Sequence, residues 1–350
     1  MIAIGSDAGL IPSNLLTGGE VTSPCVTSKW GSLHMIHAQP GSDQGSCMGP
    51  RCGKSLSKPN LSESVASAAS SGGELVASIH PTAQIEGTVA ADVVIGPFCV
   101  VGPGVVLSGG VRLHENVIVK GDTEIGERTE IFPFASIGQS AQITGYTGRP
   151  GRLKIGAGCV IREYVTINVG SEKGDLVTEI GDDCFFMMGA HVAHDCKVGR
   201  NVVMVGYSGL SGHCVIGDFV IISGHSGVHQ FVRIGESAYV GALTGVENDI
   251  IPFGMALGNR ARLKGLNIVG LKRRGIEKSR IHELRAAYRG LFAEAGTLRA
   301  RLDDVLAAHG HEPLVRTVID FIRAGGERAI CVPQYEDIRL GLQRDGGTTE

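Results

Sequence analysis

The chain has 350 residues, with 32 Lys and Arg against 35 Asp and Glu and a formal net charge of −3. This balance does not suggest general nucleic-acid binding, which usually shows as a strongly basic domain. No run of 18 apolar residues exists, so no transmembrane segment is expected. The 52 glycines and single tryptophan favour a repeat protein with many corners over a tightly interlocked globular core.

Residues 1–77 are rich in Gly, Ser, Pro and Thr and show no sustained apolar period. Such a composition predicts a disordered or low-complexity N-terminal extension. The stretch has neither the basic start nor the apolar core of a secretory signal peptide. An organellar transit peptide and an upstream-extended reading frame, with a later start at Met35 or Met48, both stay open.

From Ile79 onward a large apolar side chain returns at every sixth position, apart from one irregularity between Ile85 and Ile95 and two loops. Between residues 180 and 251 the register holds over twelve hexads. A period of six fits an extended segment followed by a corner, but neither an amphipathic helix nor an alternating strand. Three such segments close a turn of 18 residues, so the pattern predicts a parallel β-helix domain at 78–257 whose coils hydrogen-bond to one another. The twelve large residues are Ile180, Phe186, Val192, Val198, Met204, Leu210, Ile216, Ile222, Val228, Ile234, Val240 and Val246.

Five of the nine cysteines occupy the fifth, inward position of a hexad, where nearly all residues are small or β-branched. Free cysteine behaves as a small hydrophobic residue, so we interpret these five as core residues. No Cys/His cluster has zinc-finger spacing, and nothing requires an oxidising compartment. The five are Cys99, Cys159, Cys184, Cys196 and Cys214.

Three segments depart from the repeat. Loops at 139–154 and at about 169–178 leave the coil, and loops on a rigid repeat usually carry binding groups. Residues 259–280 form a basic cluster of eight Arg and Lys against the single acid Glu277.

The region 258–332 is predicted to be a basic turn followed by a small α-helical C-terminal domain. Apolar residues spaced at i, i+3 and i+4 indicate a helix from about residue 277. Two further helices fit 296–308 and 312–324, and 333–350 has the character of a tail.

Three histidines lie almost in phase with the coil. His213 and His229 follow His194 by 19 and 35 residues, close to one and two turns of 18. The spacing therefore predicts three imidazoles on one edge of three consecutive coils, facing solvent or a partner subunit. One of them could be a general base beside substrate-binding neighbours. Alternatively the three could bind zinc with an open position for water, as in the β-helical carbonic anhydrases.

Six stretches, in one order, resemble a known family. They are IHPTA (79–83), IGPFCVVGP (95–103), FASIG (134–138), AHVAHDC (190–196), GVHQF (227–231) and GLNIVGLKRRG (265–275). Over about 78–325 the chain resembles the UDP-N-acetylglucosamine O-acyltransferases of lipid A biosynthesis.

The resemblance implies a left-handed β-helix and a cytoplasmic homotrimer with active sites between neighbouring subunits. It also implies the reaction, which is transfer of a (3-hydroxy)acyl chain from acyl carrier protein to the 3-position of UDP-N-acetylglucosamine. This is the first step of lipid A biosynthesis, and no metal or other cofactor is expected besides the carrier-bound thioester.

Carried over by position, His194 matches the catalytic base, Asp195 its assistant, and Gly212 the residue whose N–H faces the developing oxyanion. Paired guanidinium groups suit the diphosphate of the nucleotide, and the rest of the basic cluster suits an acidic acyl carrier protein. The resemblance assigns substrate binding to Gln142, His191, His213, His229 and Gln230, and the nucleotide end to Asn267, Arg273 and Arg274.

The sequence departs from the family pattern at several polar positions. Ile143 and Gly145 follow Gln142 where the family carries polar sugar contacts, and Val269 replaces an acidic residue. Asn168 and Val169 stand in place of a His-Arg pair. Two alternatives therefore stay open: a UDP-3-amino sugar as the acceptor, and a non-catalytic scaffold that binds acyl carrier protein or nucleotide sugar.

Ala242 replaces a glycine that lines the acyl end of the groove in the family. The hypothesis is that its methyl group shortens or narrows the acyl chain that is accepted.

Overall fold

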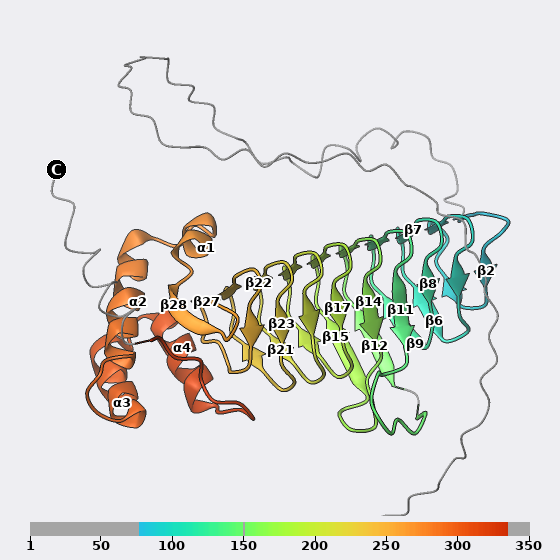
Figure 1. Ribbon diagram of the computed structural model, residues 1–350. Coiled ribbons are helices and arrows are strands. Elements are labelled where there is room, and N and C mark those ends of the chain that lie inside the picture. Colours follow the sequence, from blue (N-terminus) through green and yellow to red (C-terminus); the bar gives the residue numbers. More distant parts are fainter. Residues whose placement is uncertain (1–76, 150, 335–350) are drawn as a thin grey trace, which may run out of the picture. The chain divides into compact units, whose positions relative to one another are not determined.

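The computed structural model describes residues 77–149 and 151–334 (Figure 1). The predicted extension at 1–77, except its last residue, lies outside the described residues, as does the predicted tail beyond residue 334. Within the described ranges, none of the helices combines the length and apolar character needed to cross a membrane.

Short parallel strands stack into three sheets, and each turn of the coil adds one strand to each sheet (Figure 1). Among the described strands, β28 (Arg262–Leu266) differs, since it pairs antiparallel with β27 (Gly254–Leu257). The register follows the predicted turn, since Lys197 pairs with Val215 and Val215 with Arg233. The predicted fold class, a parallel β-helix followed by a small helical region, is confirmed.

Among the described residues the three sheets contain 11, 9 and 8 strands. The 11-stranded sheet comprises β1 (Ser78–Ile79), β4 (Val94–Ile95), β7 (Arg112–Leu113), β10 (Glu130–Ile131), β13 (Val160–Ile161), β16 (Phe185–Phe186), β19 (Val203–Met204), β22 (Ile221–Ile222), β25 (Tyr239–Val240), β27 (Gly254–Leu257) and β28 (Arg262–Leu266). The 9-stranded sheet comprises β2 (Gln84–Ile85), β5 (Val100–Val101), β8 (Ile118–Val119), β11 (Ser136–Gln139), β14 (Thr166–Asn168), β17 (His191–Val192), β20 (Gly209–Leu210), β23 (Gly227–Val228) and β26 (Gly245–Val246). The 8-stranded sheet comprises β3 (Thr88–Val89), β6 (Val105–Leu107), β9 (Asp122–Ile125), β12 (Arg152–Ile155), β15 (Val177–Ile180), β18 (Lys197–Val198), β21 (Val215–Ile216) and β24 (Arg233–Ile234).

The inward positions of the hexads form the core of the coil. All twelve large residues predicted to point inward are buried, and their exposure does not exceed the 5% of Val198. The five cysteines assigned to the fifth position are likewise buried and free, as predicted. Burial of one large aliphatic side chain contributes about 1.5–3 kcal/mol, so the column of stacked side chains is the main stabilising element of the coil.

The C-terminal region contains the three predicted helices, α2 (Lys278–Leu291), α3 (Leu298–His309) and α4 (Pro313–Arg323). The prediction of a basic turn before them was incomplete, because part of this segment forms the short helix α1 (Ile268–Arg273). The helix begins at a side-chain cap. The Asn267 side chain accepts a hydrogen bond from the Gly270 N–H at 3.0 Å, which satisfies a free donor at the helix start.

A buried ion pair joins the last turn of the coil to the helical region. Arg233 Nε lies 2.8 Å from Asp249 Oδ2, and the Asp249 side chain is 0% exposed. The Arg233 guanidinium also stacks on Phe321 of α4, 4.4 Å from the ring centroid. Asp249 pairs through its backbone with the segment 329–331, which follows α4.

We expect Asp249→Ala to lower the free energy of unfolding by about 3–5 kcal/mol, because it leaves the Arg233 charge partly buried without its partner. Urea unfolding monitored by circular dichroism measures the change. The matched control is Asp303→Ala, which removes the exposed pair with Arg323 and should cost less than about 1 kcal/mol. Equal destabilisation by the two substitutions would contradict the role given to the buried pair.

Candidate active site

The predicted histidine edge is one corner of the coil, between the 9-stranded and the 8-stranded sheet. The strands before the corner align His191 with Gly209 and Gly209 with Gly227, and the strands after it align in the same way. His194, Gly212 and Gln230 therefore occupy one position in successive coils. His213 and His229 lie one residue after and one residue before that position, so three consecutive coils bring the histidines to one corner, as predicted.

The prediction that the three rings face solvent or a partner subunit is wrong for His194, which is already buried within its own chain at 7% exposure. His213 is partly buried, and only His229 is exposed. The cause is the second loop, between β14 and β15, which covers this part of the corner: Ser171 bonds the neighbouring Asp195 and Gly174 packs against Asp195 and His213.

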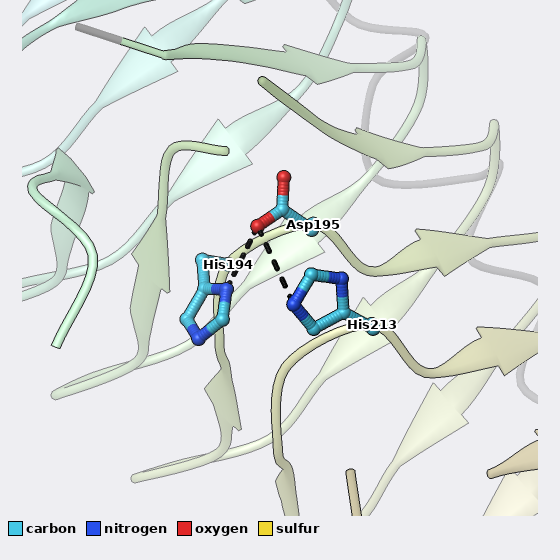
Figure 2. Close-up of side chains that lie close together, drawn as sticks. All are labelled: His194, Asp195 and His213. Atoms are coloured by element: carbon cyan, nitrogen blue, oxygen red, sulfur yellow. Dashed lines mark hydrogen bonds and ion pairs between the residues drawn. The ribbon is translucent and has the colours of Figure 1, made fainter. Parts of the chain in front are cut away.

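The Asp195 carboxylate is the centre of the site (Figure 2). Its Oδ2 lies 2.8 Å from His194 Nδ1 and 3.9 Å from His213 Nε2. Ser171 donates its hydroxyl to the same oxygen at 2.6 Å, and its backbone N–H to both carboxylate oxygens at 3.0 and 3.1 Å. Burial would raise the pKa of Asp195, but the hydrogen bonds from His194 and Ser171 outweigh it and hold the pKa below its usual value.

An ionised carboxylate can only accept, so the His194 nitrogen that faces it must carry the ring proton. A neutral His194 then has its lone pair on Nε2, which is the form of imidazole that acts as a general base. The geometry therefore fits the prediction that His194 is the base and Asp195 its assistant.

The two flanking histidines stay neutral near pH 7. The His213 ring lies edge-on to His194, with centroids 5.1 Å apart, and stacks on Phe231 at 4.6 Å. Burial lowers the pKa of His213 and outweighs the opposing charge of Asp195. Burial also lowers the pKa of His191, whose Nδ1 lies 2.7 Å from the Thr166 hydroxyl. Neutral rings of this kind can donate one hydrogen bond to a substrate without adding charge.

Gly212 has a steric role that spacing alone did not predict. A Cβ at this position would lie 2.3 Å from His194 Cε1 and 2.6 Å from His194 Nε2. Any larger residue would therefore displace the base. The Gly212 N–H has no acceptor among the described residues, which leaves it available as a donor.

Three residues that contact Asp195 were missed by the sequence analysis, and two of them, Ser171 and Gly174, lie in the second loop. Ser171 is 0% exposed, and a Cβ on Gly174 would lie 2.5 Å from Asp195 Cγ. The third, Thr178 in β15, accepts a hydrogen bond from the Asp195 N–H at 2.8 Å. The sequence showed only that this loop leaves the coil one turn before His194. It did not show which residues of the loop would contact Asp195.

The first loop, between β11 and β12, carries Gln142 as an exposed residue, and Ile143 beside it is partly buried. It is tied to the second loop by Glu172, which accepts from the Thr147 N–H at 2.9 Å. At its base lies Asn168, 1% exposed, whose side-chain amide donates to the carbonyl oxygens of Gln139 and Ser140 at 3.3 and 3.0 Å. Asn168 thus supports the loop.

The residues predicted to bind the nucleotide part of the substrate lie away from the histidine corner. Asn267, Arg273 and Arg274 line a cavity of about 690 Å³ over the 11-stranded sheet. Arg274 stacks on Phe219 at 4.0 Å and bonds the Ser237 hydroxyl. The Asn267 side chain is used to cap α1 and to donate to the Ser237 carbonyl at 2.9 Å.

Ala242 is exposed at a third place, a corner between the 11-stranded and 9-stranded sheets. A single chain therefore does not bring the nucleotide residues, the acyl-end residue and the histidine corner together.

A metal-binding arrangement at this corner would differ from the three-histidine set considered above. In the part of the chain that the structure describes, the donor atoms of His194, Asp195 and His213 lie within 4.8 Å of one another. His229 is outside this group, and its Nδ1 is bonded to Arg328 at 2.6 Å. The structure thus does not assemble the three-histidine set.

Comparisons with known proteins agree along most of the chain. Residues 249–331 match the family model described as UDP N-acetylglucosamine O-acyltransferase, domain 2, and residues 178–212 match the bacterial transferase hexapeptide repeat. The acyl-(acyl-carrier-protein)–UDP-N-acetylglucosamine O-acyltransferase of Azorhizobium caulinodans is 48% identical over 260 residues, which is 74% of this chain and 96% of that protein. The enzyme of the same name from Brucella ovis is 42% identical over 269 residues, 76% of this chain and 97% of that protein. The crystal structure of UDP-N-acetylglucosamine O-acyltransferase from Moraxella catarrhalis matches with a TM-score of 0.70 and 37% identity, over 72% of this chain and 98% of that one.

We expect Ser171→Ala to raise the pKa of Asp195, because the variant loses the hydroxyl donor at 2.6 Å and keeps only the backbone N–H of residue 171 and His194 Nδ1–H as donors. A folded pKa below the unfolded value of about 3.9 means that the carboxylate stabilises the fold above about pH 4, and that this stabilisation is lost as pH falls through the folded pKa. In the variant the loss should begin at higher pH. Carboxyl NMR titration and acid unfolding check this, with Ser108→Ala as the control. An unchanged Asp195 pKa would refute the assigned contact.

Proposed function

The chain belongs to the family of acyl-(acyl-carrier-protein)–UDP-N-acetylglucosamine O-acyltransferases, and we propose that His194 is the general base of this reaction. The enzyme transfers an acyl chain from acyl carrier protein to UDP-N-acetylglucosamine, the first step of lipid A biosynthesis. Family membership decides for acyl transfer over the hydration of carbon dioxide. The observation that carries the assignment of the base is the 2.8 Å contact of Asp195 with His194 Nδ1, which leaves Nε2 for the substrate.

In the proposed mechanism His194 Nε2 takes the proton of the sugar 3-hydroxyl while that oxygen attacks the thioester carbonyl. The Gly212 N–H donates to the carbonyl oxygen as negative charge develops on it. When the tetrahedral intermediate collapses, the C–S bond breaks, and the leaving sulfur receives the proton held by His194. Asp195 stays ionised throughout and stabilises the imidazolium that forms between the two steps.

The remaining residues of the corner bind and orient the acceptor sugar. His191 and His213 are neutral and partly buried, so they suit contacts with its hydroxyl or carbonyl oxygens. Gln142 is exposed on the first loop, and His229 and Gln230 lie in the coil after that of His213, so we assign contacts with the same sugar to these three residues as well. We propose no metal or redox cofactor, because this transfer needs only a base, an oxyanion donor and an activated thioester.

We propose a homotrimer in which each active site lies between two subunits. The separation of the histidine corner from the cavity lined by Asn267, Arg273 and Arg274 within one chain supports this arrangement. A neighbouring subunit can place its own nucleotide residues opposite the His194 corner, and a closed cyclic oligomer repeats that contact.

The donor protein is proposed to dock beside α1. Arg262, Lys272 and Lys278 are all exposed there, and a cluster of one charge sign speeds the encounter with an acidic partner. Because acyl carrier protein is the donor, we place the enzyme in the cytoplasm.

His194→Ala should lower kcat by about 100- to 10,000-fold and change KM for the nucleotide sugar much less, because the base acts in the transition state. The measurement is acyl transfer from acyl carrier protein to UDP-N-acetylglucosamine, with its 3-amino analogue assayed in parallel to identify the acceptor atom. His282→Ala, on the exposed face of α2, is the control and should keep full activity. Wild-type rates in His194→Ala would exclude the proposed base.

Ala242→Gly should shift the preferred acyl donor to a longer chain, because removal of the methyl group lengthens or widens the groove at its end. The measurement compares kcat/KM for a series of acyl carrier protein thioesters between the wild type and the variant. One methylene in an apolar pocket changes kcat/KM by about 10- to 200-fold, so a real shift is easily resolved. An unchanged chain-length profile would remove Ala242 from the acyl site.

A further inference from the structure

Arg328 reaches back from the segment after α4 to the histidine corner of the coil. Its Nε donates to the carbonyl oxygen of Gln230 at 2.9 Å, and its Nη2 lies 2.6 Å from His229 Nδ1. The contacts join residues almost a hundred positions apart in sequence. One guanidinium therefore holds both the backbone and a side chain of the corner.

These contacts decide the tautomer of His229. A guanidinium has only donors, so Nδ1 of His229 must accept from Arg328. A neutral ring then carries its proton on Nε2. Without the guanidinium, Nδ1 could instead donate to the Gln230 carbonyl oxygen, which lies 3.3 Å away. Because His229 is exposed, its Nε2–H is a hydrogen-bond donor presented outward from the corner.

The position of Arg328 is itself secured by the end of the coil. The next residues, 329–331, pair with the backbone of Asp249, whose carboxylate is buried against Arg233. Cys331 is 1% exposed and donates to the Ala261 carbonyl oxygen. The guanidinium thus lies on a segment that is held by α4 before it and by the pairing of residues 329–331 with the coil after it. Such preorganisation lowers the entropy cost of holding a donor in place.

We propose that Arg328 is a positioning residue, which fixes His229 as an Nε2–H donor for an oxygen of the sugar nucleotide. The proposal rests on the proposed function, in which His229 contacts the acceptor. Through Arg328 the C-terminal segment takes part in substrate binding while remaining outside the reacting atoms.

The test uses two full-length variants. Arg328→Met keeps the aliphatic part of the side chain without the charge, and Arg328→Lys keeps the charge but lacks the planar guanidinium group. Nitrogen NMR of labelled histidine reports the tautomer of His229 directly. We expect Nε2–H in the wild type and a clear gain of Nδ1–H in Arg328→Met.

Calorimetry with UDP-N-acetylglucosamine should show affinity weakened about tenfold in Arg328→Met, and less in Arg328→Lys. In steady-state kinetics KM should rise accordingly, with kcat within about threefold of the wild type.

Arg323→Met is the matched control, because this arginine lies in α4 and pairs with the exposed Asp303. It should change neither the tautomer nor the affinity. An unchanged His229 tautomer in folded Arg328→Met, or an unchanged affinity, would overturn the proposal. Thermal unfolding identifies a variant that fails to fold, and Arg328→Lys then carries the test. Failure of the wild type to transfer acyl groups, with the tautomer change intact, would count against the proposed function instead.

Discussion

The hydrogen bonds between successive coils are the interaction on which the rest of the structure depends. Each turn donates its backbone N–H groups to the turn beside it, as His213 does to His194 and Phe231 to Gly212. This pairing places residues one turn apart in direct contact, so stacking brings the histidines of three coils to one corner. It also explains why Gly212 must lack a side chain, since the ring of His194 lies against it.

The buried carboxylate of Asp195 imposes a second requirement. A charge with a side chain only 2% exposed is stable only if its oxygens are hydrogen-bonded. His194 supplies one donor and Ser171 supplies the rest, so the second loop completes the catalytic pair. The same contacts that stabilise the buried charge also orient the imidazole, and the stability of the loop and the chemistry of the site are therefore coupled.

Several residues expected to contact substrate are used to build the fold. Asn267 caps α1 and Arg274 packs on Phe219, so these side chains place α1 over the 11-stranded sheet. Asn168 supports the base of the first loop with its side-chain amide. Asn168 stands at a position where the chain departs from the family pattern, so here the new side chain has a structural contact of its own.

The hexad period by itself determined the coil, its inward columns, the buried cysteines and the edge shared by His194, His213 and His229, because each of these follows from repetition along the chain. Only the tertiary structure decided which loop residues reach Asp195, that α1 is a helix, and that Arg328 bonds His229. Periodicity reports contacts between equivalent positions of neighbouring coils. A loop or a C-terminal segment has no such register, and its contacts arise only when the whole chain has folded.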